Sequence, residues 1–166
     1  MKNIIKIYTD GSDIKGTGKI GYGVFILYND NEYRMSGISN QSDFKKFYNI
    51  KENVSNPTME LMALLKTLVE FRNTDLNIEV LADYQGVQKW ISGEWKAKKV
   101  YIKDMTRRIH GLINQINENG GSVKLTWVKG HSGDYGNDQA DLVAKDRKVY
   151  NEIPSLLEKF DIPKSH

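Results

Sequence analysis

Short runs of hydrophobic residues, separated by polar turns, dominate the first forty residues of the chain. Residues 4–9, 21–28 and 32–38 have the length and the β-branched and aromatic content that are typical of strands. The polar segment NDNE separates the last two runs and is typical of a tight hairpin. This pattern predicts three consecutive antiparallel strands. The polar stretch 39–56 that follows is expected to be a long surface loop.

Beyond residue 56 the hydrophobic period changes to that of a helix. Asn56 is expected to cap this helix, and Pro57 suits its first turn. The apolar residues that set the helical period are Leu61, Leu64, Leu65 and Leu68.

The second half of the chain alternates strands with helices. Strands joined by hairpins pair antiparallel, whereas strands joined through helices run parallel by right-handed crossovers. The order therefore predicts an α/β fold with a mixed five-stranded sheet, in which a three-stranded antiparallel meander is joined by two parallel strands, with helices on both faces. The remaining strands are expected at 77–83 and 122–130, the helices at 84–95, 102–118 and 137–150, and a short helix around SLLEKF in the tail.

Composition narrows the possible classes only in part. The absence of cysteine excludes disulfides, thiol nucleophiles and thiolate metal sites. A net charge of +3 permits nucleic-acid binding without arguing for it, and the basic clusters FKKF, KAKK and TRRIH are by default solvated surface. The chain has no apolar run of about 18 residues and no signal-type N-terminus, so we expect an intracellular, cytoplasmic protein without a membrane span.

Acidic residues occur where the predicted strands end and where the predicted helices begin. Asp10 is expected to end the first strand and Asp83 the fourth, so as parallel neighbours their carboxylates would emerge about 4.8 Å apart at one end of the sheet. Gly11 leaves room for a close approach to the backbone. Glu60 and Asp141 are expected in the first turns of two helices and could reach the same end. Each acid taken alone is more often a turn or cap residue, but together they suit an oxygen-ligated Mg²⁺ or Mn²⁺.

Four motifs, taken together, resemble ribonuclease H of type 1 in their order and approximate spacing. They are YTDGS, MELMALLKTL, the strand ending in VLAD, and WVKGHSGDYGNDQAD. The resemblance covers about residues 4–147, and its most specific part is the last motif. It implies the mixed sheet predicted above, a catalytic domain at residues 1–150, and a tail at 151–166. A monomer is expected.

The resemblance also implies an activity. Members of this family cleave the RNA strand of RNA–DNA hybrids, and four acids hold two divalent metal ions. The ions are expected to be Mg²⁺, with Mn²⁺ as a substitute, and the products to carry 5′-phosphate and 3′-hydroxyl ends. Because the last acid of the family follows the motif asparagine Asn137 by four residues, the match selects Asp141 rather than Asp134 or Asp138. The implied metal ligands are Asp10, Glu60, Asp83 and Asp141.

Further residues are implied to assist catalysis or to contact the hybrid. His131, in the glycine-rich loop KGHSGDYG, matches the family histidine that aids proton transfer or product departure. For the tryptophans, packing between helices is an equally good interpretation. The implied contacts to the RNA strand are Gly11, Ser12 and Asn56, those to the DNA strand are Trp90, Trp95, Lys96, Lys98 and Lys99, and Asn137 is a further candidate.

The sequence departs from the family pattern at positions other than the four acids. Tyr84 stands where serine is usual, Pro57 stands where a second asparagine is common, the basic protrusion is shortened, and the stretch 39–56 is longer than in compact members. These changes bear on hybrid affinity rather than on catalysis. Other functions with the same fold stay open at this point: a DNA recombinase or nuclease, a non-catalytic hybrid-binding domain, and a purely structural α/β domain.

Overall fold

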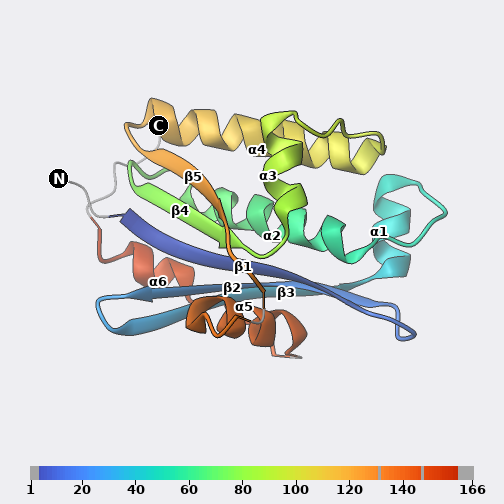
Figure 1. The fold of residues 1–166 in the computed structure, drawn as a ribbon, viewed down its shortest axis with the longest axis horizontal. Coiled ribbons are helices and arrows are strands. Elements are labelled where there is room, and N and C mark those ends of the chain that lie inside the picture. The colour runs from blue at the N-terminus through green and yellow to red at the C-terminus, as the bar shows by residue number, and fades with distance from the viewer. Residues whose placement is uncertain (1–3, 131, 147, 161–166) are drawn as a thin grey trace.

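One mixed sheet forms the centre of the molecule (Figure 1). In this computed structural model, residues 4–130, 132–146 and 148–160 are described. The strands lie in the order β3-β2-β1-β4-β5, and β2 pairs antiparallel with β1 and β3, whereas β4 pairs parallel with β1 and β5. This is the predicted topology. The bounds are β1 Ile4–Ile14, β2 Lys19–Tyr28, β3 Asn31–Asn40, β4 Asn77–Ala82 and β5 Ser122–Trp127.

Helices cover both faces of the sheet, as predicted. On one face, the buried residues of α2 form a single core with those of α4, α6 and the inner strand positions. On the other face, α5 packs against β1 and β2 (Figure 1). The bounds are α1 Gln41–Tyr48, α2 Asn56–Phe71, α3 Gln85–Ser92, α4 Val100–Glu118, α5 Tyr135–Lys145 and α6 Ile153–Leu157.

Strand periodicity assigns side chains to these two layers. Ile7 lies in the core beneath α2, whereas its neighbour Tyr8 lies under Gly136 of α5. Alternation of this kind is what a pleated strand between two helical layers requires. The β2–β3 hairpin is predicted correctly as well. Asn29 and Asp30 both have positive φ, at 49° and 63°, which is the conformation that a two-residue hairpin needs.

The expectation of a loop over residues 39–56 is wrong in part, because α1 forms there. Asn40 caps this helix by accepting a hydrogen bond from the backbone N–H of Asp43 at 2.8 Å. Phe44 and Tyr48, one turn apart, pack their rings together with centroids 4.9 Å apart. The polar composition of the stretch concealed these two aromatic anchors. Tertiary packing therefore decided in favour of a helix.

Several predicted ends also differ from the structure. β1 does not end at Asp10 but continues to Ile14, because its hairpin with β2 extends the pairing. Ser55, not Asn56, occupies the N-cap position of α2 and makes no side-chain cap bond. Because α5 begins at Tyr135, Asp141 lies in its second turn rather than its first.

The C-terminal segment lies along β3. Met35 forms an antiparallel bridge with Asn151, and the backbone N–H of Glu152 donates to the carbonyl of Arg34 at 2.8 Å. The expected helix 137–150 therefore ends early, at Lys145, and the chain becomes extended. The short helix predicted in the tail is α6. Among the described helices, none has the length and apolar character that a membrane crossing requires.

Candidate active site

Asp10 lies where β1 runs past the end of β4. The two strands pair from Ile4↔Asn77 to Tyr8↔Leu81, so beyond Tyr8 the side of β1 that faced β4 is open. Asp10 is two residues past this point and is only 4% exposed. The site is therefore the gap at the carboxyl end of β4, which is where ligands bind in open α/β sheets. The predicted place was right, although the strand itself does not end there.

Gly11 allows the N-terminal part of α2 to approach β1 closely. A Cβ atom on Gly11 would lie 2.4 Å from the backbone nitrogen of Glu60 and 2.5 Å from the carbonyl carbon of Met59. No side chain fits at that distance, so glycine is required for this packing. The close contact brings Glu60, which is buried, to the same gap as Asp10.

Asp83 enters the site from the residue directly after β4. Its backbone carbonyl accepts a hydrogen bond from the indole Nε1 of Trp127 at 3.1 Å. The backbone of Gly130 runs alongside it, and a Cβ there would lie 3.0 Å from Oδ2 of Asp83. The segment after β5 therefore forms one wall beside this carboxylate.

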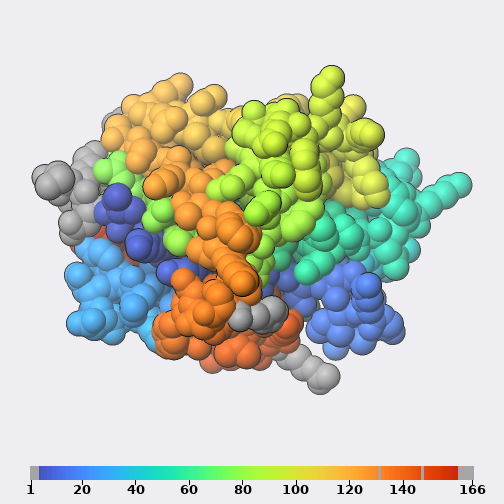
Figure 2. Space-filling view, viewed as in Figure 1, coloured from blue at the N-terminus to red at the C-terminus, as the bar shows by residue number. Residues whose placement is uncertain are grey.

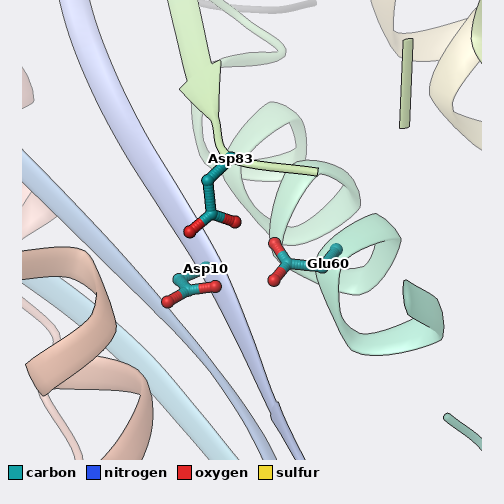
Figure 3. Close-up of side chains that lie close together, drawn as sticks. All are labelled: Asp10, Glu60 and Asp83. Atoms are coloured by element: carbon teal, nitrogen blue, oxygen red, sulfur yellow. The ribbon is translucent and has the colours of Figure 1, made fainter. Parts of the chain in front are cut away.

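Three carboxylates converge in this gap (Figure 3). Asp10, Glu60 and Asp83 each offer an oxygen, and these atoms all lie within 4.8 Å of one another. They line a cavity of about 220 Å³. Gly11, Ser12 and Asn56, the predicted contacts to the RNA strand, line the same cavity, as does Asp141.

Asp141 approaches from α5, on the opposite face from α2. Its carboxylate lies 3.0 Å from the ammonium of Lys145, one turn further along the helix. Lys145 and Asp13, neither of which was predicted from the sequence, also line the cavity. The spacing of four residues between Asp141 and Lys145 was a usable signal, because such pairs are neighbours on a helix.

Burial and crowding perturb the carboxylates. The pKa of Asp10 is raised to about 7, chiefly by burial; a hydrogen bond with Glu60 lowers it, whereas the interactions with Asp141 and Asp83 raise it. Burial, followed by the influence of Asp10, raises the pKa of Glu60 well above its usual range. Without a cation, these acids therefore share protons at neutral pH.

The donor set fits a hard divalent cation. Oε2 of Glu60 is buried and has no hydrogen-bond partner among the described residues. All the converging side-chain groups are carboxylate oxygens, which Mg²⁺ and Mn²⁺ prefer. The N–H of Gly11 donates to Oδ1 of Asp10 at 2.9 Å and so helps to fix its orientation. The acidic cluster could thus hold metal. The direct indication is that Oε2 of Glu60 has no hydrogen-bond partner among the described residues.

The structure describes only part of the motif WVKGHSGDYGNDQAD. His131 lies outside the described residues. Asn137 is buried below the surface of α5, where its backbone N–H donates to Oδ1 of Asp134 at 3.0 Å. Its own Oδ1 has no partner in the described part of the chain. Its assignment as a substrate contact stays a prediction.

The predicted contacts to the DNA strand lie on α3 and the segment after it. Tyr84, Trp90 and Trp95 form a cluster with ring centroids 6.0–6.4 Å apart. Trp90 is partly buried against the core, which agrees with the packing interpretation, whereas Trp95 is 40% exposed with Lys89 over its ring. Tyr84, which stands where serine is usual in the family, thus supplies one ring of this cluster. The exposed lysines of the same segment are Lys96, Lys98 and Lys99.

Comparison with known proteins agrees with this geometry. The family sequence model of RNase H matches residues 2–148. A Ribonuclease H of Ruthia magnifica is 36% identical over 154 residues, which cover 86% of this chain and 93% of the relative. A Ribonuclease H of Francisella tularensis subsp. novicida is 34% identical over 154 residues, covering 86% and 90%.

A solved structure shares the fold. The LC11 ribonuclease H of type 1, in complex with an RNA/DNA hybrid, superposes with a TM-score of 0.63 at 20% identity, covering 84% of this chain and 92% of that one. The match of the family model over nearly the whole chain, together with the two curated relatives, establishes the relationship. This chain belongs to the ribonuclease H family of enzymes.

Proposed function

We propose that this enzyme is an endonuclease that hydrolyses the RNA strand of RNA–DNA hybrids and leaves 5′-phosphate and 3′-hydroxyl ends. The observation that carries the proposal is the cluster of Asp10, Glu60 and Asp83, whose oxygens lie within 4.8 Å of one another in a cavity open to solvent. The hybrid bound to the LC11 enzyme supports this class of substrate.

The residues that would hold metal are four of the five acids that line the cavity. Two Mg²⁺ ions, or Mn²⁺ in their place, would supply charge neutralisation at the phosphodiester and an activated water for in-line attack when bound. The ligands are Asp10, Glu60, Asp83 and Asp141.

The chain itself positions these groups. The N–H of Gly11 holds Asp10, and the packing of β1 on α2 holds Glu60. Lys145 balances the charge of Asp141 at the rim of the cavity. His131 of the motif WVKGHSGDYGNDQAD is assigned the transfer of a proton to or from the reacting groups, a role that the motif alone supports.

The contacts to the two strands of the hybrid are assigned to different parts of the chain. Gly11, Ser12 and Asn56 line the cavity and are placed to contact the RNA strand beside the cleaved bond. The DNA strand is assigned to α3 and the segment after it, and the assigned contact residues are Trp90, Trp95, Lys96, Lys98 and Lys99. Asn137 of α5 is a further candidate contact.

The proposal is tested by cleavage of an end-labelled RNA–DNA hybrid, with RNA–RNA and DNA–DNA duplexes in parallel. The wild type is expected to cut only the RNA of the hybrid, with Mg²⁺ or Mn²⁺ and not with chelator. Asp10→Asn is expected to lower activity by several orders of magnitude, because it removes the central carboxylate. Asp30→Asn, which changes an exposed carboxylate in the β2–β3 turn, is the matched control and should cut normally.

Other results would contradict the proposal in different ways. Hybrid binding without any cleavage would make the chain a non-catalytic recognition domain. Cleavage or joining of DNA would favour a recombinase-like nuclease. Cleavage of the hybrid that leaves 3′-phosphate ends would contradict the proposed mechanism but not the proposed substrate.

A further inference from the structure

The unexpected helix α1 is tied directly to the entrance of the active site. The side chain of Gln41 is buried and bonds both backbone groups of Val54: its Nε2 donates to the carbonyl at 2.9 Å, and its Oε1 accepts from the N–H at 2.8 Å. Val54 lies two residues before Asn56, which lines the acidic cavity. The position of α1 is therefore fixed relative to the cavity.

Aromatic packing fixes the orientation of α1 on its other side. The ring centroids of Phe44 and Tyr48 lie 5.7 and 5.9 Å from that of Tyr101, near the start of α4. The hydroxyl of Tyr48 also donates to Oδ2 of Asp104 at 3.1 Å. Because Gln41, Phe44 and Tyr48 face inward, Lys46 lies on the outward face, whereas Lys45, one turn after Gln41, lies at the edge of the inward face.

The exposed side of α1 and of the residues after it carries more lysines than acids. Lys46 is exposed, Lys45 is half-exposed, and Lys51 is exposed just beyond the helix. None of these three lysines forms an ion pair with a described residue. The acids of the same segment are Asp43, whose Oδ2 accepts a hydrogen bond from Asn40, and Glu52, which lies close enough to Lys99 to interact with its charge. We call Lys45, Lys46 and Lys51 the α1 lysine surface.

This surface continues toward the segment already assigned to the DNA strand. Figure 2 shows α1 and the residues after it (cyan to teal) at one end of the molecule, next to the start of α4 (yellow-green). Lys99, at that start, has its ammonium 5.7 Å from the ring centroid of Tyr101, the residue on which α1 packs. The exposed lysines just before and within the first turn of α4 are Lys98, Lys99 and Lys103.

We propose that the α1 lysine surface binds the sugar–phosphate backbone of the nucleic-acid duplex beside the segment that is cleaved. The proposal rests on the proposed function, because it takes the acidic cavity as the place of the scissile bond. Free ammonium groups on a rigid helix suit a regularly spaced polyanion, and lysine binds phosphate as a point charge without reading sequence. The surface would thus add affinity for longer duplexes and compensate for the shortened protrusion.

The proposal predicts a specific dependence on salt. Each lysine that neutralises a phosphate contributes about one unit to the slope of log affinity against log salt concentration. The variant Lys45→Ala/Lys46→Ala/Lys51→Ala is therefore expected to flatten this slope by roughly two to three units. The expected KM for a long hybrid rises several-fold at low salt, whereas kcat stays at the wild-type value.

The experiment uses a duplex in which one short run of ribonucleotides fixes the cleavage position. Flanking duplex is then lengthened on one side or the other. We expect lengthening on one side to lower the KM of the wild type, and we expect the triple variant to lose this gain. Binding is measured separately by fluorescence anisotropy, in an Asp10→Asn background that cannot cut the probe.

A second triple variant, Lys6→Ala/Lys124→Ala/Lys159→Ala, is the control, because it removes the same charge from exposed lysines elsewhere. It should leave the length dependence intact. Equal slopes and equal KM values for the two triple variants would overturn the proposal. If the wild type cuts no hybrid, the proposed function fails, but the difference in anisotropy between the two variants still decides whether the surface binds duplex. Thermal melts of both variants exclude an effect of unfolding.

Discussion

Asp10 and Glu60 occupy a position that charged side chains normally avoid. Both are at least 96% buried, and their carboxyl groups lie close together at the end of β4. Burial and the neighbouring carboxylates raise the pKa of each. In the free protein these buried carboxylates repel one another and lower the stability of the fold. A bound cation removes this repulsion, so the groups favour cation binding rather than folding.

The raised pKa of Asp10 predicts how the metal-free protein responds to pH. The folded state holds this proton more tightly than the unfolded chain, so the contribution to stability is fully present below about pH 4 and is lost as pH rises through about 7. Asp10→Asn removes that loss and should raise the melting temperature of the metal-free protein at pH 8 relative to wild type. Calorimetry at pH 5 and at pH 8 measures the difference.

Two comparisons accompany this prediction. Adding Mg²⁺ should raise the melting temperature of the wild type more at pH 8 than at pH 5, because protons compete with the cation for these oxygens. Asp30→Asn changes an exposed carboxylate and should not alter the pH dependence. The interpretation is wrong if Asp10→Asn and wild type melt in parallel across this range.

At the scale of elements, glycines set the distances between the sheet and its two helical layers. Gly11 permits the contact of β1 with α2, as described above. Gly23 does the same on the other face, since a Cβ there would lie 2.3 Å from the backbone nitrogen of Ala144 and 2.6 Å from the carbonyl oxygen of Ala140. The two helices that carry Glu60 and Asp141 therefore approach the sheet through positions without side chains.

We predict that Gly23→Ala forces α5 away from β2. The free energy of unfolding should fall by about 1–3 kcal/mol, as is usual for overpacking. Hybrid cleavage should fall as well, because α5 carries Asp141. Urea denaturation and a cleavage assay measure the two effects.

Gly111→Ala is the control for this prediction. Gly111 lies in α4, and nothing in the described structure is within 4 Å of a Cβ placed there. The alanine should therefore stabilise the protein by up to about 1 kcal/mol, because it favours the helix. Equal stability changes at the two positions would mean that α5 can shift without cost.

At the scale of the whole molecule, the C-terminal segment completes the core. Ile153 and Leu156 of α6 are fully buried in the same cluster as the leucines of α2. The segment before α6 pairs with β3, which would otherwise be a free edge of the sheet. Residues beyond the matched region 2–148 thus contribute to the stability of the folded chain. The division of the chain at residue 150 stays a prediction.

We predict that Leu156→Ala destabilises the enzyme by about 2–5 kcal/mol through the cavity that it leaves. The cleavage rate of the folded variant should be unchanged at low temperature, because α6 does not contribute to the acidic cavity. Val149→Ala, in the same segment but 60% exposed, should change stability by no more than about 0.5 kcal/mol. Denaturant titrations distinguish these cases, and similar values for both would show that the tail is not part of the cooperative unit.

Local pattern accounts for much of the fold and for part of the site. The β-branched and aromatic content of residues 21–28 and the period of the leucines of α2 are properties of neighbouring residues, so most strands and helices and their order were predictable. The resemblance selected Asp10, Glu60, Asp83 and Asp141, and the structure brings the first three together while the fourth lines the same cavity. In α1, local composition misled, because Phe44 and Tyr48 find their partner in Tyr101, more than fifty residues away.

Apart from α1, the sequence by itself determined which segments become strands and helices, because hydrophobic period acts through residues adjacent in the chain. It also excluded thiolate ligands from the site, since the chain has no cysteine. Only the tertiary structure decided that β1 passes the end of β4, that Gly11 admits α2, and that Lys145 joins the cavity. These depend on distances between segments far apart in sequence, which are set by how whole elements pack and not by any local pattern.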